Sequence, residues 1–446
     1  MSGTGDTPIL ADSVQTTDEG VDILDRRVYP FQRRWVHCAT AEDVAVAIEQ
    51  MVTQSHGPLF AATAGMTLAA REARRAGPGA AAESLRAAGR RLIATRPTNN
   101  HIRDAVTAIL AATVDGPLAL ASGEELVRAV AEAATAHDAA YRAGADALGR
   151  NAAALLEDGA RVLTHCWGDA YLVAAVQAAE RMGKRLEFVC TETRPYLQGA
   201  RLTAATLVEM GYRPTVITDG MVPSALADGL ADVAMTASDR VTMDGHVVNK
   251  VGTLAVALAA RAFGAPMYVL AHAPDPLSPG IADVEIEHRD GEEVLHVLGT
   301  RTAAEGTRGY YPAFDATPPH LVTRIVTEHG AFEPARVADH FAVPPGGSAT
   351  PDATTPHAAA PNAAAPGSAA PASATAGSAA PSAAASGAVV PPRFPAPGVP
   401  AMPGVPAMPG IPAIPGAPAT GVFAAPGART PAGGSTRPAP PPRTAT

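Results

Sequence analysis

The chain has 446 residues and a formal net charge of −9, which allows two or three domains and argues against a nucleic-acid-binding surface. Its first twenty residues contain neither a basic nor an apolar segment, and no run of about 18 uncharged apolar residues precedes Pro344, so we expect neither a secretory signal nor a membrane span. Three cysteines in so long a chain favour a reducing compartment over a disulfide framework, and we expect a cytoplasmic protein.

Residues 40–150 have the composition and spacing of helices. The stretch TAEDVAVAIEQMV begins with Thr40, a residue suited to cap a helix, and continues with apolar residues at helical spacing. Ala and Arg are frequent up to residue 150, and runs of β-branched residues are few. We expect a flexible N-terminus over residues 1–20 and a helical domain over residues 21–150.

After residue 150 the pattern changes to short apolar runs separated by helical stretches. Strands are predicted at residues 160–166, 185–192, 213–219, 231–238 and 265–272. Apolar strands that alternate with helices are typical of a doubly wound, mainly parallel sheet, in which ligands bind outside the carboxyl ends of the strands. The sequence therefore predicts an α/β protein with a Rossmann-like catalytic domain over residues 151–342. Neither glycine-rich nucleotide fingerprint accompanies it.

Residues 343–446 consist mainly of Ala, Pro, Gly, Ser and Thr, and such a composition lacks the apolar side chains that offset the entropy of ordering. A proline-rich repeat from Pro397 to Thr420 favours polyproline II, and Gly at every sixth position rather than every third argues against collagen. We expect a disordered tail that is either a spacer or a docking segment for an unknown proline-recognising partner.

Cys166 stands at the end of the first strand predicted for the sheet, in the stretch LTHCWGDAYL. A helix that begins near Asp169 would direct its positive end at the sulfur and lower the pKa of the thiol. The alternative is a buried structural cysteine. His165 should point to the opposite face of the strand and is expected to be structural, and Asp169 is expected to cap the helix.

Asp239 follows another predicted strand, ADVAMTAS, where it is either a turn residue or a general acid/base that faces Cys166. Asn249 and Lys250 are expected at the very start of a helix, and Arg96 stands just before another. A cation at a helix start opposes the helix dipole, so this pattern indicates either an anion site or two solvated charges.

The stretch TETRPYLQGARLTA gathers further polar residues near one strand end. Gln198 is suited to bind a polyol hydroxyl, whereas Arg194 and Arg201 are expected to hold Glu192 or the loop. The histidines show no zinc-binding spacing, so no metal is expected.

Four stretches in combination resemble one family: TETRPYLQGARLTA, ITDGMV, SDRVTMDGHVVNKVGT and PAFDATPPHLVTRIVTEHGAF. From about residue 40 to residue 335 the chain resembles methylthioribose-1-phosphate isomerase, ribose-1,5-bisphosphate isomerase and the regulatory subunits of eukaryotic translation initiation factor two B. The resemblance implies an aldose–ketose isomerase that converts a 5-substituted ribose 1-phosphate into the ribulose 1-phosphate. It implies a homodimer and no cofactor.

The resemblance also implies residue roles. Catalysis would fall to Cys166 and Asp239, a pair that the regulatory subunits generally lack. Substrate would be bound by Arg96, Gln198, Asn249, Lys250, Ser55, His56 and Gly57. The alternative is a non-catalytic regulatory protein that senses a sugar phosphate or a nucleotide.

Two positions depart from the family pattern. Ser55, His56 and Gly57 stand in the sequence QSHGP where the family has R-G-A-P, so either phosphate is bound more weakly or the sugar carries another substituent. Trp167 stands where the family usually has Asn, and its ring either stacks on a ligand or fills space.

Overall fold

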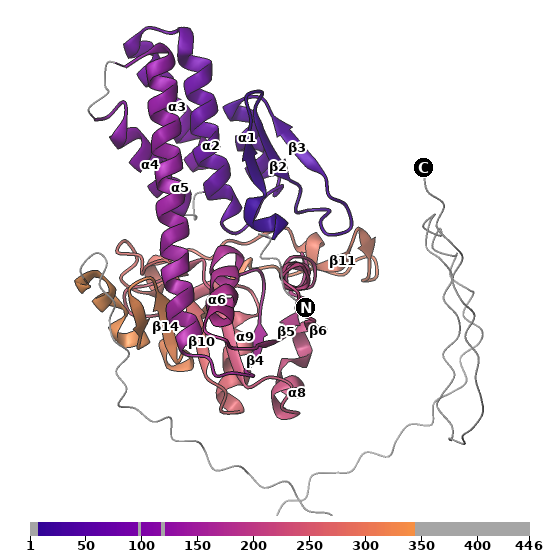
Figure 1. Cartoon of the computed structure of the whole chain (residues 1–446). Helices are drawn as coiled ribbons and strands as arrows, with labels where there is room; N and C mark the ends of the chain where they lie inside the picture. Colours follow the sequence, from indigo (N-terminus) through magenta and orange to yellow (C-terminus); the bar gives the residue numbers. More distant parts are fainter. Residues whose placement is uncertain (1–7, 97–99, 117–120, 344–446) are drawn as a thin grey trace, which may run out of the picture. The chain divides into compact units, whose positions relative to one another are not determined.

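The computed structural model describes residues 8–96, 100–116 and 121–343, and the expected tail beyond Val343 lies outside them (Figure 1). The N-terminal region contains the expected helices, namely α1 (Ala41–Glu49), α2 (Gly57–Glu72), α3 (Pro78–Ala94), α4 (Asn100–Ala112) and α5 (Gly123–Ala154). Thr40 caps α1 as predicted, since its hydroxyl accepts from the N–H of Asp43 at 3.1 Å and the Asp43 carboxylate accepts from the N–H of Thr40 at 2.9 Å.

The N-terminal region also contains a small antiparallel sheet that the sequence analysis does not predict. Its strands are β1 (Val14–Thr16), β2 (Val21–Leu24) and β3 (Trp35–Cys38), in that order. Residues 8–20, expected to be flexible, instead hold a short 3₁₀ turn (Ile9–Asp12) and β1. The physical reason is that Leu10 is buried and β1 pairs with β2 along its length.

The second region is built around a seven-stranded sheet of order β15-β14-β10-β7-β4-β5-β6. Its strands are β4 (Arg161–Thr164), β5 (Glu187–Thr191), β6 (Thr215–Ile217), β7 (Val233–Ala237), β10 (Met267–Leu270), β14 (Arg324–Thr327) and β15 (Gly330–Phe332). All neighbours are parallel except β14 and β15. The five predicted strands are confirmed, and their order is that of a Rossmann fold with an antiparallel edge strand added.

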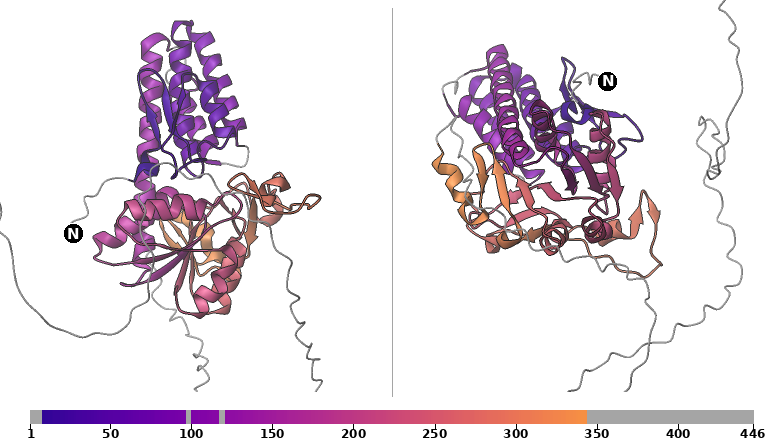
Figure 2. Two further views of the ribbon diagram at one scale, coloured as in Figure 1. Left: turned by 90° about the vertical axis from the view of Figure 1, so that its right-hand side faces the viewer. Right: turned by 60° about the horizontal axis from the view of Figure 1, so that its bottom comes forward.

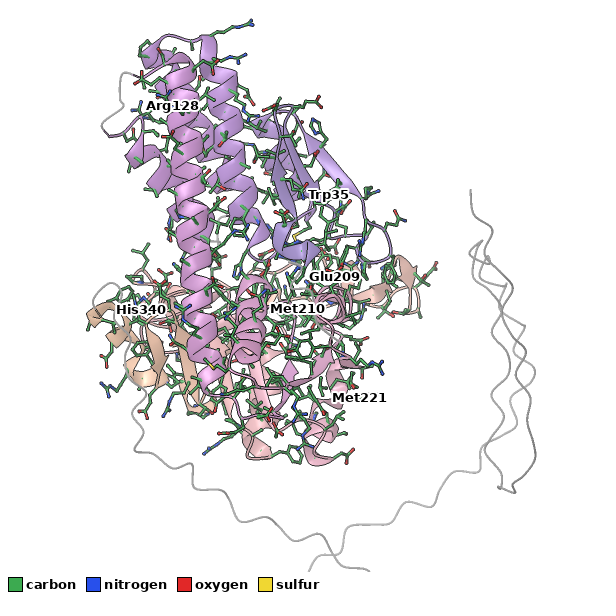
Figure 3. The ribbon with its side chains drawn as sticks, viewed as in Figure 1. Trp35, Arg128, Glu209, Met210, Met221 and His340 are labelled. Carbon is green, nitrogen blue, oxygen red and sulfur yellow. The ribbon has the colours of Figure 1, made fainter. Side chains whose placement is uncertain are left out.

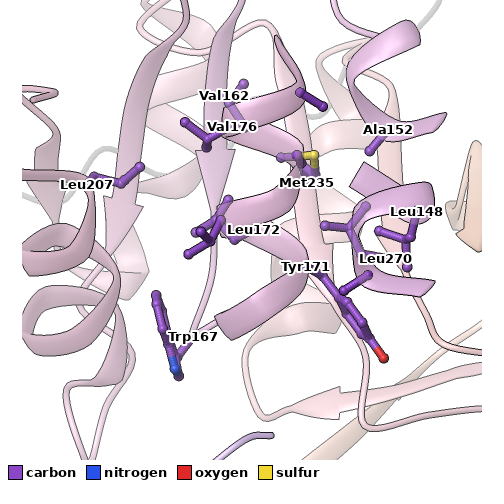
Figure 4. Close-up of a cluster of buried hydrophobic side chains, with 14 of the residues drawn as sticks. Leu148, Ala152, Val162, Trp167, Tyr171, Leu172, Val176, Leu207, Met235 and Leu270 are labelled. Atoms are coloured by element: carbon purple, nitrogen blue, oxygen red, sulfur yellow. The ribbon is translucent and has the colours of Figure 1, made fainter. Parts of the chain in front are cut away.

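Helices cover both faces of this sheet (Figure 2). One face packs on α5, α6 (Asp169–Arg181) and α7 (Ala204–Glu209), and the other on α8 (Val222–Ala227) and α9 (Thr253–Ala262). Figure 4 shows the first of these clusters, where Leu172 and Val176 of α6 lie over Val162 of β4 and Met235 of β7. The long helix α5 packs against α6 and β14, so it carries the N-terminal helices onto the sheet.

Polar contacts join the N-terminal region to the sheet region. Glu209, labelled in Figure 3, accepts from the Tyr29 hydroxyl at 2.6 Å and from the N–H of Ile9 at 3.0 Å. Arg26 forms an ion pair of 3.0 Å with Asp169, and both side chains are buried. These contacts fix the two regions beside each other.

A three-stranded antiparallel sheet has the order β13-β9-β8. Its strands β8 (Arg240–Val241) and β9 (Val247–Lys250) precede β10 in the sequence, and β13 (Phe314–Thr317) follows it. The expectation that Asn249 and Lys250 begin a helix is wrong, because they end β9 and α9 begins at Thr253. Gly252, with φ 107°, separates the two elements. A short hairpin follows, β11 (His296–Val297) and β12 (Thr300–Arg301). None of the described helices is long and apolar enough to cross a membrane.

Candidate active site

Cys166 and Asp239 follow two neighbouring strands of the seven-stranded sheet. Strands β4 and β7 are parallel partners, with Leu163 opposite Ala234, and they lie where the strand order reverses. Cys166 comes two residues after the end of β4, and Asp239 comes two residues after the end of β7. Since ligands of open α/β sheets bind beyond the carboxyl ends of strands at such a reversal, the topology itself brings the thiol and the carboxyl to one binding edge.

A pocket opens at this edge, and residues of the N-terminal region form part of its wall. It is lined by Met51, Gln54, Ser55, His56, Pro58, Arg96, His101, Cys166, Trp167, Gln198, Ala237, Ser238, Asp239, Arg240, Val248, Asn249, Lys250, Val284, Glu285, Glu287, Arg289 and Phe314. Of the expected site residues, Gly57 is absent from this lining. A Cβ at Gly57 would lie 1.9 Å from the Thr53 hydroxyl, so glycine is needed there for packing.

The Cys166 thiol is protonated at neutral pH. Burial raises its pKa to about 11, the Lys250 charge lowers it and the Asp239 charge raises it. The expectation that the following helix produces a reactive thiolate is therefore wrong, because burial outweighs the dipole. Cys166 has φ 63°, a strained value for a residue with a Cβ, and its N–H donates to the Thr193 hydroxyl at 2.9 Å.

His165 and Asp169, which flank this corner, are held by the protein itself. The His165 ring contacts the Thr191 hydroxyl at 2.7 Å and the Val251 carbonyl at 3.0 Å, as expected of a structural residue. Asp169 does not cap α6 through its side chain. It accepts instead from Arg26 and from the N–H of His56 at 3.2 Å.

Asp239 lines the pocket and is a solvent-exposed residue there. Its N–H donates to the Val248 carbonyl at 3.0 Å, which fixes the carboxyl beside β9. The surrounding protein raises the pKa of Asp239 by desolvation, and the charges of Lys250, Arg289 and Arg96 oppose the rise. The net increase lets this carboxyl hold a proton closer to neutral pH than an ordinary aspartate does, which suits general acid/base chemistry.

Three cations, Lys250, Arg289 and Arg96, act electrostatically on Asp239, and a fourth basic residue of the pocket wall, Arg240, pairs with Asp275 at 3.4 Å. Lys250 is buried, its ammonium donates to the Ala313 carbonyl at 2.9 Å, and it lies 4.5 Å from the centre of the Phe314 ring. Burial lowers the pKa of Lys250, and burial together with the Arg289 charge lowers that of Arg96. A bound anion would relieve this mutual repulsion.

The sequence analysis missed the segment 284–289, which supplies the third cation. The Nε of Arg289 donates to Glu287 Oε1 at 2.6 Å. Burial lowers the pKa of Arg289 but the contacts with Glu287 outweigh it, so the net pKa is raised. Glu285, Glu287 and Arg289 occupy every second position after the last predicted strand. This alternation of charged residues was the sequence signal that could have indicated a polar segment at the site.

Ser55, His56, Gln198 and Asn249 are uncharged site residues expected from the sequence that line the pocket. Ser55 has φ 56°, and the His56 ring lies 4.3 Å from that of Tyr171. Burial lowers the pKa of His56 to about 4, so its imidazole is neutral at pH 7. The Gln198 amide donates to Gln54 Oε1 at 3.4 Å, and Asn249 donates to the Thr253 hydroxyl at 2.9 Å.

Arg194 and Arg201 hold loops, as one of the two expected alternatives. Arg194 donates to the His296 carbonyl at 2.9 Å, and Arg201 donates to the carbonyls of Arg26 and Arg27. Neither arginine binds Glu192 in these contacts. Among the described residues no cluster of three or more His, Cys, Asp or Glu side chains is arranged to hold a metal ion.

Comparison with known families decides the class of protein. Residues 54–334 match the model of the initiation factor 2 subunit family, which is more than half of the chain. The chain belongs to the initiation factor 2 subunit family. A curated member of similar sequence, methylthioribose-1-phosphate isomerase of Anaeromyxobacter dehalogenans, is 38% identical over 74% of this chain and 95% of its own length.

Solved structures of family members have the same architecture. The 5-methylthioribose 1-phosphate isomerase of Pyrococcus horikoshii OT3 superposes with a TM-score of 0.67 at 26% identity, over 76% of this chain and 98% of that one. The delta subunit of translation initiation factor eIF-2B from A. fulgidus gives 0.64 at 31% identity, over 73% and 96%. With its isomerase relatives, this member of the initiation factor 2 subunit family is a sugar-phosphate isomerase.

Proposed function

We propose that the protein converts a 5-substituted ribose 1-phosphate into the corresponding ribulose 1-phosphate. The observation that carries this proposal is that Cys166 and Asp239 follow the adjacent strands β4 and β7 and line one pocket with four basic residues, Arg96, Arg240, Lys250 and Arg289. The relatives named methylthioribose-1-phosphate isomerase support the same reaction class.

Asp239 is proposed as the general acid/base. A phosphate on the anomeric carbon prevents simple ring opening, so the bond from C1 to the ring oxygen must break with a proton delivered to that oxygen. The raised pKa of Asp239 keeps a proton available for this delivery. Arg96, Lys250 and Arg289 then balance the charge of the deprotonated carboxylate and of the phosphate.

Cys166 is proposed to assist the hydrogen transfer from C2 to C1, by way of an enediol or by a hydride shift. With a pKa of about 11 the thiol acts as a proton donor or a neutral hydrogen-bonding group rather than as a resident thiolate. The carbonyl forms at C2 as the C2 hydroxyl loses its proton, and C1 keeps the phosphate. No other reactant is consumed.

The anion and hydroxyl contacts are assigned by charge. We propose that Arg96, Lys250 and Asn249 bind the phosphate and the neighbouring hydroxyls, and that Gln198 binds a sugar hydroxyl. Ser55 and His56 form part of the pocket wall. Gly57 lies outside the lining, where the lack of a side chain lets it pack against Thr53. Membership of the isomerase family is consistent with a small-molecule substrate. We further propose that the protein is a cytoplasmic homodimer and that it binds no nucleic acid.

The direct experiment is incubation of the full chain with a panel of 5-substituted ribose 1-phosphates, followed by ³¹P and ¹³C NMR. Appearance of a ketone carbon at C2 with retention of phosphate at C1 supports the proposal. Complete recovery of every aldose, under conditions where circular dichroism shows folded protein, contradicts it.

A second candidate is a non-catalytic sensor of sugar phosphates or nucleotides. The specific observation in its favour is that the loop Gln54–Pro58 places no cation in the pocket, together with the likeness to an eIF-2B delta subunit. Calorimetric binding of a ribose 1-phosphate without any ketose product would favour the sensor over the enzyme.

A further inference from the structure

Four buried side chains of the pocket wall carry polar atoms that have no hydrogen-bond partner among the described residues. They are Nε2 of Gln54, Nδ1 of His56, Nε1 of Trp167 and Oε1 of Gln198, on side chains of residues between 4% and 6% exposed. In Figure 4 the Trp167 nitrogen points away from Leu172 and its cluster. Because buried polar atoms are nearly always paired, four such atoms around one pocket indicate that a ligand supplies their partners.

These four side chains are uncharged at pH 7, His56 because burial lowers its pKa to about 4. Arg96, Arg289, Glu287 and Asp239 act on one another electrostatically and form a charged end. The charges that act on His56 are instead those of Asp169, Arg26 and His272, which lie outside the pocket wall. A sugar phosphate whose anion binds at the charged end therefore extends the other end of its carbon chain toward the uncharged one.

The unpaired atoms define the group that fits there. Gln198 donates to Gln54 Oε1, which leaves the amide N–H groups of Gln54 as donors and the carbonyl of Gln198 as an acceptor. If the oxygen and nitrogen of both side-chain amides are exchanged, one donor and one acceptor again remain unpaired. The kind of ligand group required therefore does not depend on how these amide atoms are assigned. The indole N–H of Trp167 adds a donor. A hydroxyl group donates one hydrogen bond and accepts two, and thus satisfies these three groups, whereas Nδ1 of His56 is not among the atoms it pairs.

We propose that the uncharged end of the pocket, formed by Gln54, Gln198, Trp167 and His56, binds a hydroxyl group at C5 of the sugar, so that the substrate class is a ribose 1-phosphate with a free 5-hydroxyl. This inference rests on the proposed isomerisation and replaces the 5-substituted sugar of that proposal with one that has a free 5-hydroxyl. Gln54 and Trp167 are the specificity-determining residues of the assignment.

Other substituents at C5 leave at least one of these polar groups without a hydrogen-bond partner. A thioether sulfur is a weak acceptor and no donor, so it cannot satisfy the carbonyl of Gln198. A phosphate is an acceptor that would face that carbonyl, and the nearby cation, Arg26, is already paired with Asp169. A site built to bind a hydroxyl rejects analogues that lack it by factors that reach about 10⁴.

The test compares kcat/KM for ribose 1-phosphate, 5-deoxyribose 1-phosphate and 5-methylthioribose 1-phosphate with the full-length chain. We expect ribose 1-phosphate to exceed both others by about 100-fold or more. Equal or better turnover of the 5-deoxy or 5-methylthio compound overturns the assignment while leaving the proposed isomerisation intact. Turnover of none of the three by folded protein overturns the assignment, and the proposed isomerisation falls with it only if the full panel of 5-substituted ribose 1-phosphates is also recovered unchanged.

Variants separate recognition from folding. Trp167→Phe keeps the aromatic volume and removes only the N–H, and Gln54→Leu removes the amide. In both, the preference for ribose 1-phosphate over its 5-deoxy analogue should shrink by about 10-fold or more, with kcat/KM for the analogue preserved or increased. Gln50→Leu, at an exposed glutamine outside the pocket, is the matched control and should keep the wild-type ratio. An unchanged ratio in folded Trp167→Phe contradicts the proposal even if Gln54→Leu does not fold.

Discussion

Lys250 is the charged residue that acts most strongly on the Cys166 thiol: its buried ammonium lowers the thiol pKa, and the thiolate form in turn raises that of Lys250. The two side chains come from different sheets, Cys166 from the corner after β4 and Lys250 from the end of β9. Their coupling links the proposed hydrogen-transfer group to the proposed phosphate site.

Replacement of Lys250 by Met should raise the pKa of Cys166 above its value of about 11, since the largest opposing charge is removed. At a fixed alkaline pH the native-state alkylation rate of the variant should fall. Cys38 and Cys190 are fully buried, so the reaction reports on Cys166. Lys184→Met, outside the pocket, is the control. Faster alkylation in Lys250→Met would show that the coupling is assigned with the wrong sign.

His56 should make stability depend on pH. Its folded pKa of about 4 lies below the ordinary 6.5, so the unfolded chain binds more protons between these values and stability decreases as pH falls through this window. The shift corresponds to about 3 kcal/mol when fully expressed.

Urea denaturation across this window checks the prediction. The wild-type free energy of unfolding should fall more steeply with decreasing pH than that of His56→Asn, whereas His320→Asn, at an exposed position, should follow the wild type. Parallel pH profiles for wild type and His56→Asn would refute the role of His56.

The buried Arg26–Asp169 ion pair should contribute to folding through the cost of breaking it. Asp169→Asn leaves the guanidinium buried without its counter-charge, so the free energy of unfolding should decrease by about 3–5 kcal/mol. Asp158→Asn removes an exposed pair with Arg185, at 3.7 Å, and should lower the free energy of unfolding far less. If chemical denaturation shows the same decrease in the free energy of unfolding for both variants, the buried pair contributes no more to stability than the exposed one.

Residues 345–446 should be dispensable for the reaction, because all the described residues that line the pocket lie between Met51 and Phe314. A chain that ends at Pro344 should keep kcat and KM within about 2-fold of the full chain, as expected of residues outside a site. Steady-state kinetics on the two purified proteins decides this. Insoluble or inactive truncated protein would assign the segment a part in folding or in catalysis.

Five strands of the large sheet could be predicted because buried strands are short, nearly continuous apolar runs, as in β4 and β7. The other two strands, β14 and β15, were not predicted. The short strands β1 and β3 mix polar and apolar residues, so the sequence alone does not separate them from loops. VVNK was assigned to a helix start because VGTLAVAL follows it, yet the pairing of Val248 with Arg240 makes it a strand.

The site was predictable where chemistry coincides with a strand end, as at Cys166 and Asp239. Arg289 was missed because segment 284–289 belongs to no regular strand or helix, and its place in the pocket depends on tertiary contacts. Burial, which decides the protonation of Cys166, is likewise a property of the folded chain that helix-dipole reasoning on the sequence does not supply.

The most direct test of the account uses two aspartates that flank the same strand. Asp239 follows β7 at the pocket, and Asp232 precedes it at the opposite end, where it pairs with Arg161. With the preferred aldose 1-phosphate followed by ³¹P NMR, Asp239→Asn and Cys166→Ser should each lower kcat by about 10³-fold or more in folded protein, whereas Asp232→Asn should remain near wild type. Turnover near the wild-type rate in both Asp239→Asn and Cys166→Ser would contradict the assignment of this pair as the catalytic centre.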